Sequence, residues 1–261
     1  AFRRAVVYYG DIFFNYQSQQ NMDLPAKFIK LIIKAAGSIK GDNSTNFLVD
    51  RLSKKSRYFN EIIEALWLKK PNLTTAAITT ITHHVANKIE QSKSKVAYYR
   101  ESIHNKSLLL LQQSIMMEIR QDLQVLLKAF ALLYERDKVD RVIELLSLGN
   151  TAKISNAIEI AELIIPKKYF IPLNTLVELI NDVKHDDVMV TKNRVLPAGA
   201  LIEEILKNNK ANFSEWTRSI ACYTLPKLKK NEFSLTILDG DVSKDDYLFN
   251  ETKNYVLTML K

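Results

Sequence analysis

The sequence predicts an all-α fold, in which helix pairs stack into an α-solenoid with two long central helices. Three observations predict it. Apolar residues recur at helical spacing along almost all of the 261 residues. Gly and Pro number only six each, too few for the turns of an all-β chain of this length. Short segments that resemble the second helix of a repeat return along the chain, at 3–12, 30–39, 60–68, 216–225 and 251–260.

The first 70 residues predict short helices in antiparallel pairs, at 2–16, 25–37, 46–52 and 58–68. The repeated segments lie 27 to 35 residues apart, a spacing typical of helical-repeat proteins. One helix pair cannot bury both of its faces, so each pair needs a neighbour on either side. The resulting stack would offer a large surface for holding partners.

Two long helices are expected next, at 72–102 and 105–134, because neither segment contains Gly or Pro. Each is long enough for about eight turns at 3.6 residues per turn. The second is strongly apolar, so we expect it to be central. Shorter helices follow, with stops at Gly149 and Pro166. We therefore predict a single domain over 1–261, made of short pairs (1–70), a long hairpin (72–135) and C-terminal repeats (136–261).

The composition indicates in which compartment the protein is expected and whether it contains a membrane span. A single cysteine excludes an internal disulfide framework and is typical of a reducing compartment; we expect Cys222 to be a small buried side chain. No run of about 20 apolar residues resembles a bilayer span. Helical sequence begins at once without an initiator Met, so we expect the chain to be a piece of a longer protein or a trimmed form of one.

The net charge of +8 is unevenly distributed, with 18 Lys and Arg against 9 Asp and Glu in residues 1–120, and 19 against 20 thereafter. A basic half favours weak, salt-dependent attraction to an anionic membrane surface, nucleic acid or an acidic protein. A purely solubilising charge is the alternative. The candidate contacts with an anionic partner are Lys27, Lys30, Lys34, Arg51, Lys54, Lys55 and Arg57. The first three fall on one helical face at i, i+3 and i+7.

No pattern typical of catalysis emerges. His83 and His84 are consecutive on a predicted helix and would project about 100° apart, which does not suit one metal ion. The carboxylate pairs at 186–187, 203–204 and 245–246 are more simply helix caps and solvated faces. Phosphate-binding and nucleophile motifs are absent. We expect no enzymatic activity, metal or cofactor.

Trp216 is expected to be structural, on a buried stripe that it shares with Ile220 and Tyr223. Ser214 stands where an N-cap would start this helix. Arg218 lies off the stripe and could reach a carboxylate on a neighbouring repeat.

The order of several segments resembles the HEAT-repeat region of bacterial proteins related to the ATP/ADP translocase and major-facilitator transporters. The segments are 126–134, 142–149, 155–164, 172–178, 216–223 and 251–252. In those proteins a membrane transporter-like domain precedes the repeats, and a cyclic-nucleotide-binding-like domain often follows. The resemblance implies a non-enzymatic, cytoplasmic regulatory or scaffolding module at the inner face of the membrane, with a protein or adjoining domains as partner. The alternative is a nucleic-acid-binding HEAT-repeat protein, such as the alkylpurine DNA glycosylase class.

Overall fold

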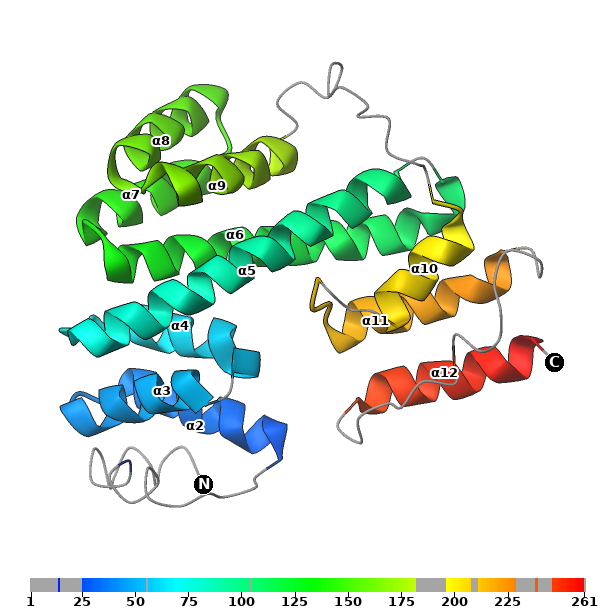
Figure 1. The fold of residues 1–261 in the computed structure, drawn as a ribbon, viewed down its shortest axis with the longest axis horizontal. Coiled ribbons are helices and arrows are strands. Elements are labelled where there is room, and N and C mark those ends of the chain that lie inside the picture. The colour runs from blue at the N-terminus through cyan, green and yellow to red at the C-terminus, as the bar shows by residue number, and fades with distance from the viewer. Residues whose placement is uncertain are drawn as a thin grey trace. The chain divides into compact units, whose positions relative to one another are not determined.

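A computed structural model describes residues 14, 25–54, 56–103, 105–181, 196–207, 211–228, 238 and 246–260. Over these residues the chain forms α-helices and short 3-10 turns without any strand, which confirms the all-α class (Figure 1). The helices are α2 (Ala26–Ser38), α3 (Asp42–Lys54), α4 (Phe59–Lys69), α5 (Thr75–Ser102), α6 (Leu109–Leu133), α7 (Arg136–Ser147), α8 (Thr151–Ile164), α9 (Lys167–Ile180), α10 (Ala198–Lys207), α11 (Glu215–Thr224) and α12 (Tyr247–Leu260). The first repeated segment, 3–12, lies outside the described residues.

The helices form two compact units. Unit 1 holds Ala1–Lys88 and Gln124–Leu173, and unit 2 holds Ile89–Leu123 and Asn174–Lys261. The boundary crosses α5, α6 and α9, so these helices contribute to both units. The two long helices expected from the sequence are present as α5, with 28 residues, and α6, with 25.

In unit 1, α2, α3 and α4 pack against one another. The buried face of α2 is formed by Ile29, Ile32, Ile33, Ala35 and Ala36, as its amphipathic pattern predicts. Lys30 pairs with Glu61, while Gly37 lies against Ala65, so residue numbers rise together along α2 and α4. These two helices therefore run parallel, with α3 as the intervening chain segment.

The close approach of α2 and α4 depends on a glycine. A Cβ at Gly37 would lie 2.8 Å from the Cα of Ala65, closer than real Cβ contacts come. The missing side chain thus lets the two backbones approach at this level. Later in unit 1, α7 packs on α8, and Gly149 between them has a φ of 65°, the left-handed conformation that ends many helices. The predicted stop at Gly149 is confirmed.

In unit 2, α11 packs against both α10 and α12. The carboxylate of Glu215, in the first turn of α11, accepts the N–H groups of Leu248 and Phe249 in the first turn of α12. Further along both helices the rings of Tyr223 and Tyr255 stack, 6.2 Å apart. Helices α11 and α12 therefore run side by side in the same direction, as Figure 1 shows.

The prediction that Trp216 is buried is wrong, because 51% of this residue is exposed. Trp216, Ile220 and Tyr223 do not share one buried stripe. Ile220 faces the core, whereas Tyr223 shares the open face with Trp216. Other details of this segment are confirmed, since Ser214 accepts the N–H of Thr217 as an N-cap and Arg218 pairs with Asp246 at 2.9 Å.

The start of α12 also differs from expectation. The side chain of Asp246 is engaged by Arg218, and the carboxylate that accepts the first N–H groups of α12 belongs to Glu215. A negative group at a helix N-terminus is favoured by the helix dipole whichever element supplies it. Asp245 lies outside the described residues. None of the described helices combines the length and the apolar character that crossing a bilayer requires.

Candidate functional site

An open groove of about 590 Å³ lies between the parallel helices α2 and α4 of unit 1. Its α2 wall consists of Lys27, Lys30, Leu31 and Lys34, and its α4 wall consists of Glu61, Glu64, Ala65 and Leu68. Each set falls at i, i+3, i+4 and i+7, so each is one continuous stripe of its helix. Three of the candidate contacts identified from sequence therefore line one groove.

The floor of the groove is apolar and accessible. Leu31 is 46% exposed and Leu68 is 59% exposed. Phe28, three residues before Leu31 on α2, is also exposed but does not line the groove. The aliphatic stems of the lysines can extend this apolar surface while their ammonium groups remain in water. Large apolar side chains that stay open along two adjacent helices are typical of a binding surface.

The charges of the groove are unequal on its two walls. Lys30 pairs with Glu61 at 2.6 Å, and Glu64 is bound by Lys128 of α6, so both acidic groups of the α4 wall are neutralised. Lys27 and Lys34 make no ion pair with any residue that the structure describes. The groove therefore carries two available cations on the α2 side.

The remaining candidates lie elsewhere in unit 1. Lys54 pairs with Asp50 of its own helix at 2.8 Å. Arg51 lies over the ring of Phe47, and Arg57 over the ring of Tyr58. Neither arginine lines the groove, and Lys55 lies outside the described residues. Lys27, Lys30 and Lys34 therefore line one groove, and the other described candidates lie outside it.

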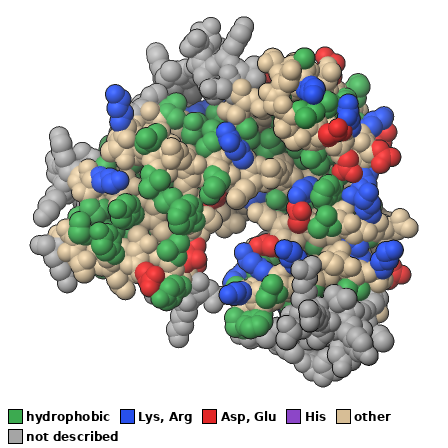
Figure 2. Space-filling view, turned by 180° about the vertical axis from the view of Figure 1, so that it is seen from behind, with side chains coloured by type: hydrophobic (Ala, Val, Ile, Leu, Met, Phe, Trp, Pro, Cys, Tyr) green, Lys and Arg blue, Asp and Glu red, His purple; other side chains and the backbone are tan. Residues whose placement is uncertain are grey.

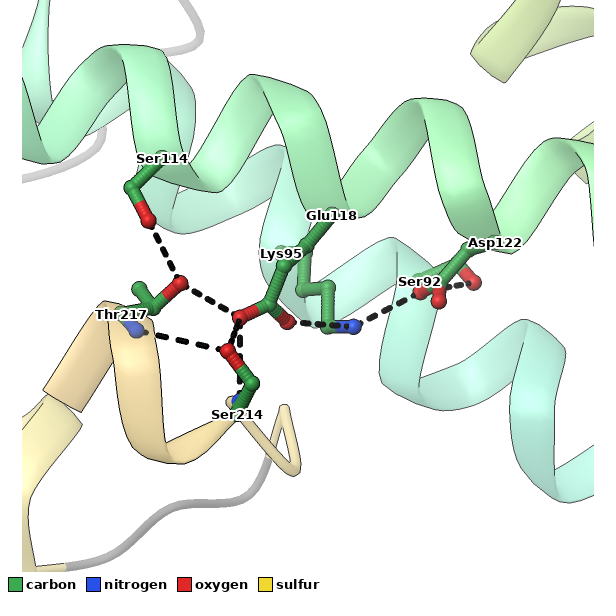
Figure 3. A network of polar contacts seen from close by, with 7 residues as sticks. All are labelled: Ser92, Lys95, Ser114, Glu118, Asp122, Ser214 and Thr217. Atoms are coloured by element: carbon green, nitrogen blue, oxygen red, sulfur yellow. Dashed lines mark hydrogen bonds and ion pairs between the residues drawn. The ribbon is translucent and has the colours of Figure 1, made fainter. Parts of the chain in front are cut away.

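A second cluster, buried in unit 2, was not foreseen. Lys95 of α5 lies 2.9 Å from both Glu118 and Asp122 of α6, and the three side chains are between 2% and 5% exposed (Figure 3). Asp122 also accepts the hydroxyl of Ser92 at 3.0 Å. We call these residues, together with Ser114, Ser214 and Thr217, the Lys95 network.

The network extends to the start of α11. One carboxylate oxygen of Glu118 accepts the backbone N–H of Ser214 at 2.9 Å, the hydroxyl of Ser214 at 2.6 Å and the hydroxyl of Thr217. Because the Thr217 proton points to Glu118, Ser114 must donate its hydroxyl to Thr217, at 2.7 Å. Buried hydroxyls and charges are thus satisfied by one another.

The protonation state of Lys95 follows from its surroundings. Burial pulls the pKa of Lys95 down, but the carboxylates of Asp122 and Glu118 outweigh burial and leave this pKa above its ordinary value. The amine therefore stays charged at neutral pH. With its donors aimed at two carboxylates, it is unsuited to act as a nucleophile or base, and the cluster serves to fix the N-terminus of α11 against α5 and α6.

Other residues singled out in the sequence have ordinary surroundings. Burial, followed by the neighbouring charge of His83, lowers the pKa of His84. Cys222 is fully buried, as expected, and burial raises the pKa of its thiol to about 12. Within the described ranges, no three His, Cys, Asp or Glu side chains come together in a way that could hold a metal ion.

The sequence does contain a signal for the Lys95 network. Glu118 and Asp122 are four residues apart and lie beside the apolar stripe of Leu111, Ile115 and Ile119 in α6. Charged residues at such positions must find partners, because burying an unpaired charge is costly.

Comparison of the chain with protein families, with curated protein sequences and with solved structures finds no match.

Proposed function

We propose that this protein is a non-enzymatic helical interaction module that binds an acidic helical segment of a partner protein in the α2–α4 groove. The observation that carries the proposal is the groove itself, with an open apolar floor and two available lysines along one wall. In helix-in-groove binding, the bound helix presents apolar anchors at i, i+3, i+4 and i+7 to an apolar groove.

The two available lysines define the charge pattern of the partner. Lys27 and Lys34 are seven residues apart on α2, or about 10.5 Å along the axis at 1.5 Å per residue. A helix lying along the groove would present carboxylates at i and i+7 to reach both. Between them, its apolar residues would contact Leu31, Ala65 and Leu68.

The strength of this interaction should come mainly from the apolar contact. Exposed ion pairs contribute about 0.2–1 kcal/mol each, whereas burying apolar surface contributes about 25 cal/mol per Å². The lysines would therefore select and orient the partner more than they hold it. Reversing both charges adds repulsion to the lost attraction, so we expect a loss of about 1–2 kcal/mol, roughly tenfold in affinity.

The packing of α2, α3 and α4 supports the further proposal of an α-solenoid. Alternate helices, α2 and α4, run parallel there, as they do in stacked helix pairs. The membrane-adjacent, transporter-associated setting rests on the sequence resemblance alone.

The proposal is tested with a designed 18-residue helical peptide that carries Leu along one face and Glu at i and i+7. The control peptide carries Gln in place of Glu. Binding of each to the whole chain is measured by fluorescence anisotropy at low and high salt. We expect the Glu peptide to bind more tightly than the Gln peptide, with a difference that shrinks as salt screens the ion pairs.

Matched variants separate the groove from general positive charge. Lys27→Glu/Lys34→Glu should weaken binding of the Glu peptide about tenfold. Lys167→Glu, an exposed position in α9 of the same unit and outside the groove, should leave it unchanged. A 20-base-pair DNA duplex and vesicles with anionic lipid are measured alongside. If DNA binds tightly through Lys27 and Lys34 while the peptides do not bind, the nucleic-acid alternative is correct and the proposal is not.

A further inference from the structure

Glu64 lies on the α4 wall of the groove, but its partner lies outside the groove. Its carboxylate is bound by the ammonium of Lys128 from α6, and Lys128 is not among the residues that line the groove. Both residues belong to unit 1. The side chain of Glu64 is 43% exposed, whereas that of Lys128 is 17% exposed. The charge that Glu64 presents to a ligand in the groove therefore depends on a mostly buried cation outside it.

Lys128 is held in place by an aromatic ring as well as by Glu64. Its ammonium lies 4.8 Å from the centre of the Trp67 ring. The negative face of an indole attracts a cation, and the attraction is stronger where both groups are partly withdrawn from water. Trp67 and Glu64 are three residues apart on α4, so they lie on the same side of that helix, and one ammonium contacts both.

The Trp67 ring is in turn fixed by α7. Its indole N–H donates a hydrogen bond of 2.8 Å to the carboxylate of Asp140. Arg136 donates to the backbone carbonyl of Trp67 at 2.6 Å and pairs with Asp140 at 3.3 Å. Because α7 binds both the ring and the backbone of Trp67, the place that receives the Lys128 ammonium is preorganised.

The register of the parallel helices α2 and α4 indicates which cation Glu64 would bind if it lost its partner from α6. Lys30 pairs with Glu61, and Gly37 lies against the residue after Glu64. The α2 residues between 30 and 37 therefore face the part of α4 that contains Glu64. Lys34 is the lysine among them, and it lines the groove. Glu64 would thus find its next counter-charge in Lys34.

A lysine in the groove stays available only where the carboxylates near it have other partners. Figure 2 shows Lys and Arg side chains beside Asp and Glu side chains on the face of unit 1 that it draws. In the groove, Glu61 is occupied by Lys30. Glu64 is occupied by Lys128, and Lys34 pairs with no carboxylate that the structure describes. The position of Lys128 therefore accounts for the availability of Lys34.

From these contacts we infer that Lys128 is a specificity-determining residue of the groove. By binding Glu64 it keeps Lys34 available for one of the two carboxylates of the partner helix, while Lys27 serves the other carboxylate independently of Lys128. The inference rests on the proposed binding of an acidic helix in this groove. Lys128 is a positioning residue, because its effect passes through Glu64 and not through contact with the partner.

The pairing is tested first without any peptide. A water-soluble carbodiimide joins a lysine to a carboxylate that contacts it, and mass spectrometry of the digested whole chain identifies the joined residues. We expect a Glu64–Lys128 product in the parent. In Lys128→Met, a Glu64–Lys34 product should appear at several times its yield in the parent. Lys138→Met removes the lysine of an exposed pair with Glu135, also in unit 1, and should leave the Glu64 products unchanged.

The consequence for specificity is measured with the Glu peptide. In the parent, Lys34→Gln should weaken binding about threefold, as expected for one exposed ion pair. In Lys128→Met the same change should have almost no effect, because Glu64 already occupies Lys34. Adding Glu64→Gln to Lys128→Met should restore the effect of Lys34→Gln. Lys128→Arg, which keeps a cation for Glu64, should behave as the parent.

Two results would overturn the inference. One is a Glu64–Lys34 product as abundant in the parent as in Lys128→Met. The other is an effect of Lys34→Gln that is equal in both chains. If neither the Glu peptide nor the Gln peptide binds the parent, the proposed function is refuted, and the carbodiimide products alone decide the role of Lys128. Lys128→Gln, which also lacks the charge, replaces Lys128→Met if that variant loses the helical circular dichroism of the parent.

Discussion

Replacing Lys95 by Met should destabilise unit 2 strongly, because it removes the one cation of the Lys95 network. The Met side chain is unbranched and only one atom shorter than Lys, but it leaves the Glu118 and Asp122 carboxylates buried without a counter-charge. Removing one partner of a buried ion pair costs about 3–5 kcal/mol. The hydroxyl groups around both carboxylates remain, so the loss should not exceed this range.

The same magnitude follows from protonation. The variant can relieve the repulsion by folding with one carboxyl group protonated. At pH 7 this costs about 4 kcal/mol relative to the unfolded chain, in which carboxyl groups have a reference pKa near 4.3. At pH 5 the cost of protonation falls to about 1 kcal/mol. The destabilisation by Lys95→Met should therefore shrink by about 2–3 kcal/mol between pH 7 and pH 5.

Urea unfolding followed by circular dichroism measures the effect, with hydrogen exchange of α11 reporting which segment loosens first. Lys93→Met is the matched control, because Lys93 lies two residues away on α5 but forms an exposed pair with Glu90. It should change stability by less than about 1 kcal/mol. A Lys95→Met variant within 1 kcal/mol of the parent at pH 7, or a loss that does not depend on pH, would refute the buried-charge reasoning.

Three further predictions concern single groups. The pKa of Glu101 is raised by burial and then by the carboxylate of Glu204, so ionisation of this group in the folded state costs stability as the pH rises above about 4.5. Glu101→Gln should therefore raise the urea midpoint at pH 7, and the difference from the parent should disappear below pH 4. An equal gain at both pH values would contradict this reasoning. Cys222, with a thiol pKa of about 12 in the folded protein, should react with iodoacetamide at pH 8 at least a hundredfold more slowly than it does in the urea-unfolded chain. Mass spectrometry can follow the reaction. Equal rates in the two states would show an accessible thiolate. Gly37→Ala should lower the free energy of unfolding by about 1–3 kcal/mol, because the added Cβ would force α2 away from Ala65. The control Ser38→Ala, at the exposed end of the same helix, should not lower the free energy of unfolding in this way. A Gly37→Ala variant as stable as the parent would mean that the two helices separate easily.

Much of the helical fold could be predicted from sequence, because helices depend on local features. The scarcity of Gly and Pro predicted α5 and α6 to within a few residues, and Gly149 ends α7 as expected. The i, i+3, i+7 spacing placed Lys27, Lys30 and Lys34 on one face of α2 before any neighbour was known.

Which neighbour covers a face could not be predicted, because it depends on packing between distant segments. The α4 wall of the groove comes from residues about 30 positions away, and its approach requires Gly37 against Ala65. Trp216 was assigned to the core for the same reason. Its stripe is apolar, but α12 packs on α11 in a way that leaves Trp216 and Tyr223 open. The Lys95 network likewise joins α5, α6 and α11, which the sequence alone does not bring together.

A charge-exchange experiment in the groove tests the central claim most directly. Binding of the Glu peptide and of a Lys peptide, with Lys at the same i and i+7 positions, is measured against the parent chain and against Lys27→Glu/Lys34→Glu. The account predicts that each single exchange weakens binding about tenfold and that the Lys peptide with the double variant recovers affinity to within about threefold of the original pair. If the combined exchange gives no recovery, Lys27 and Lys34 do not face the partner, and the groove is not the binding site.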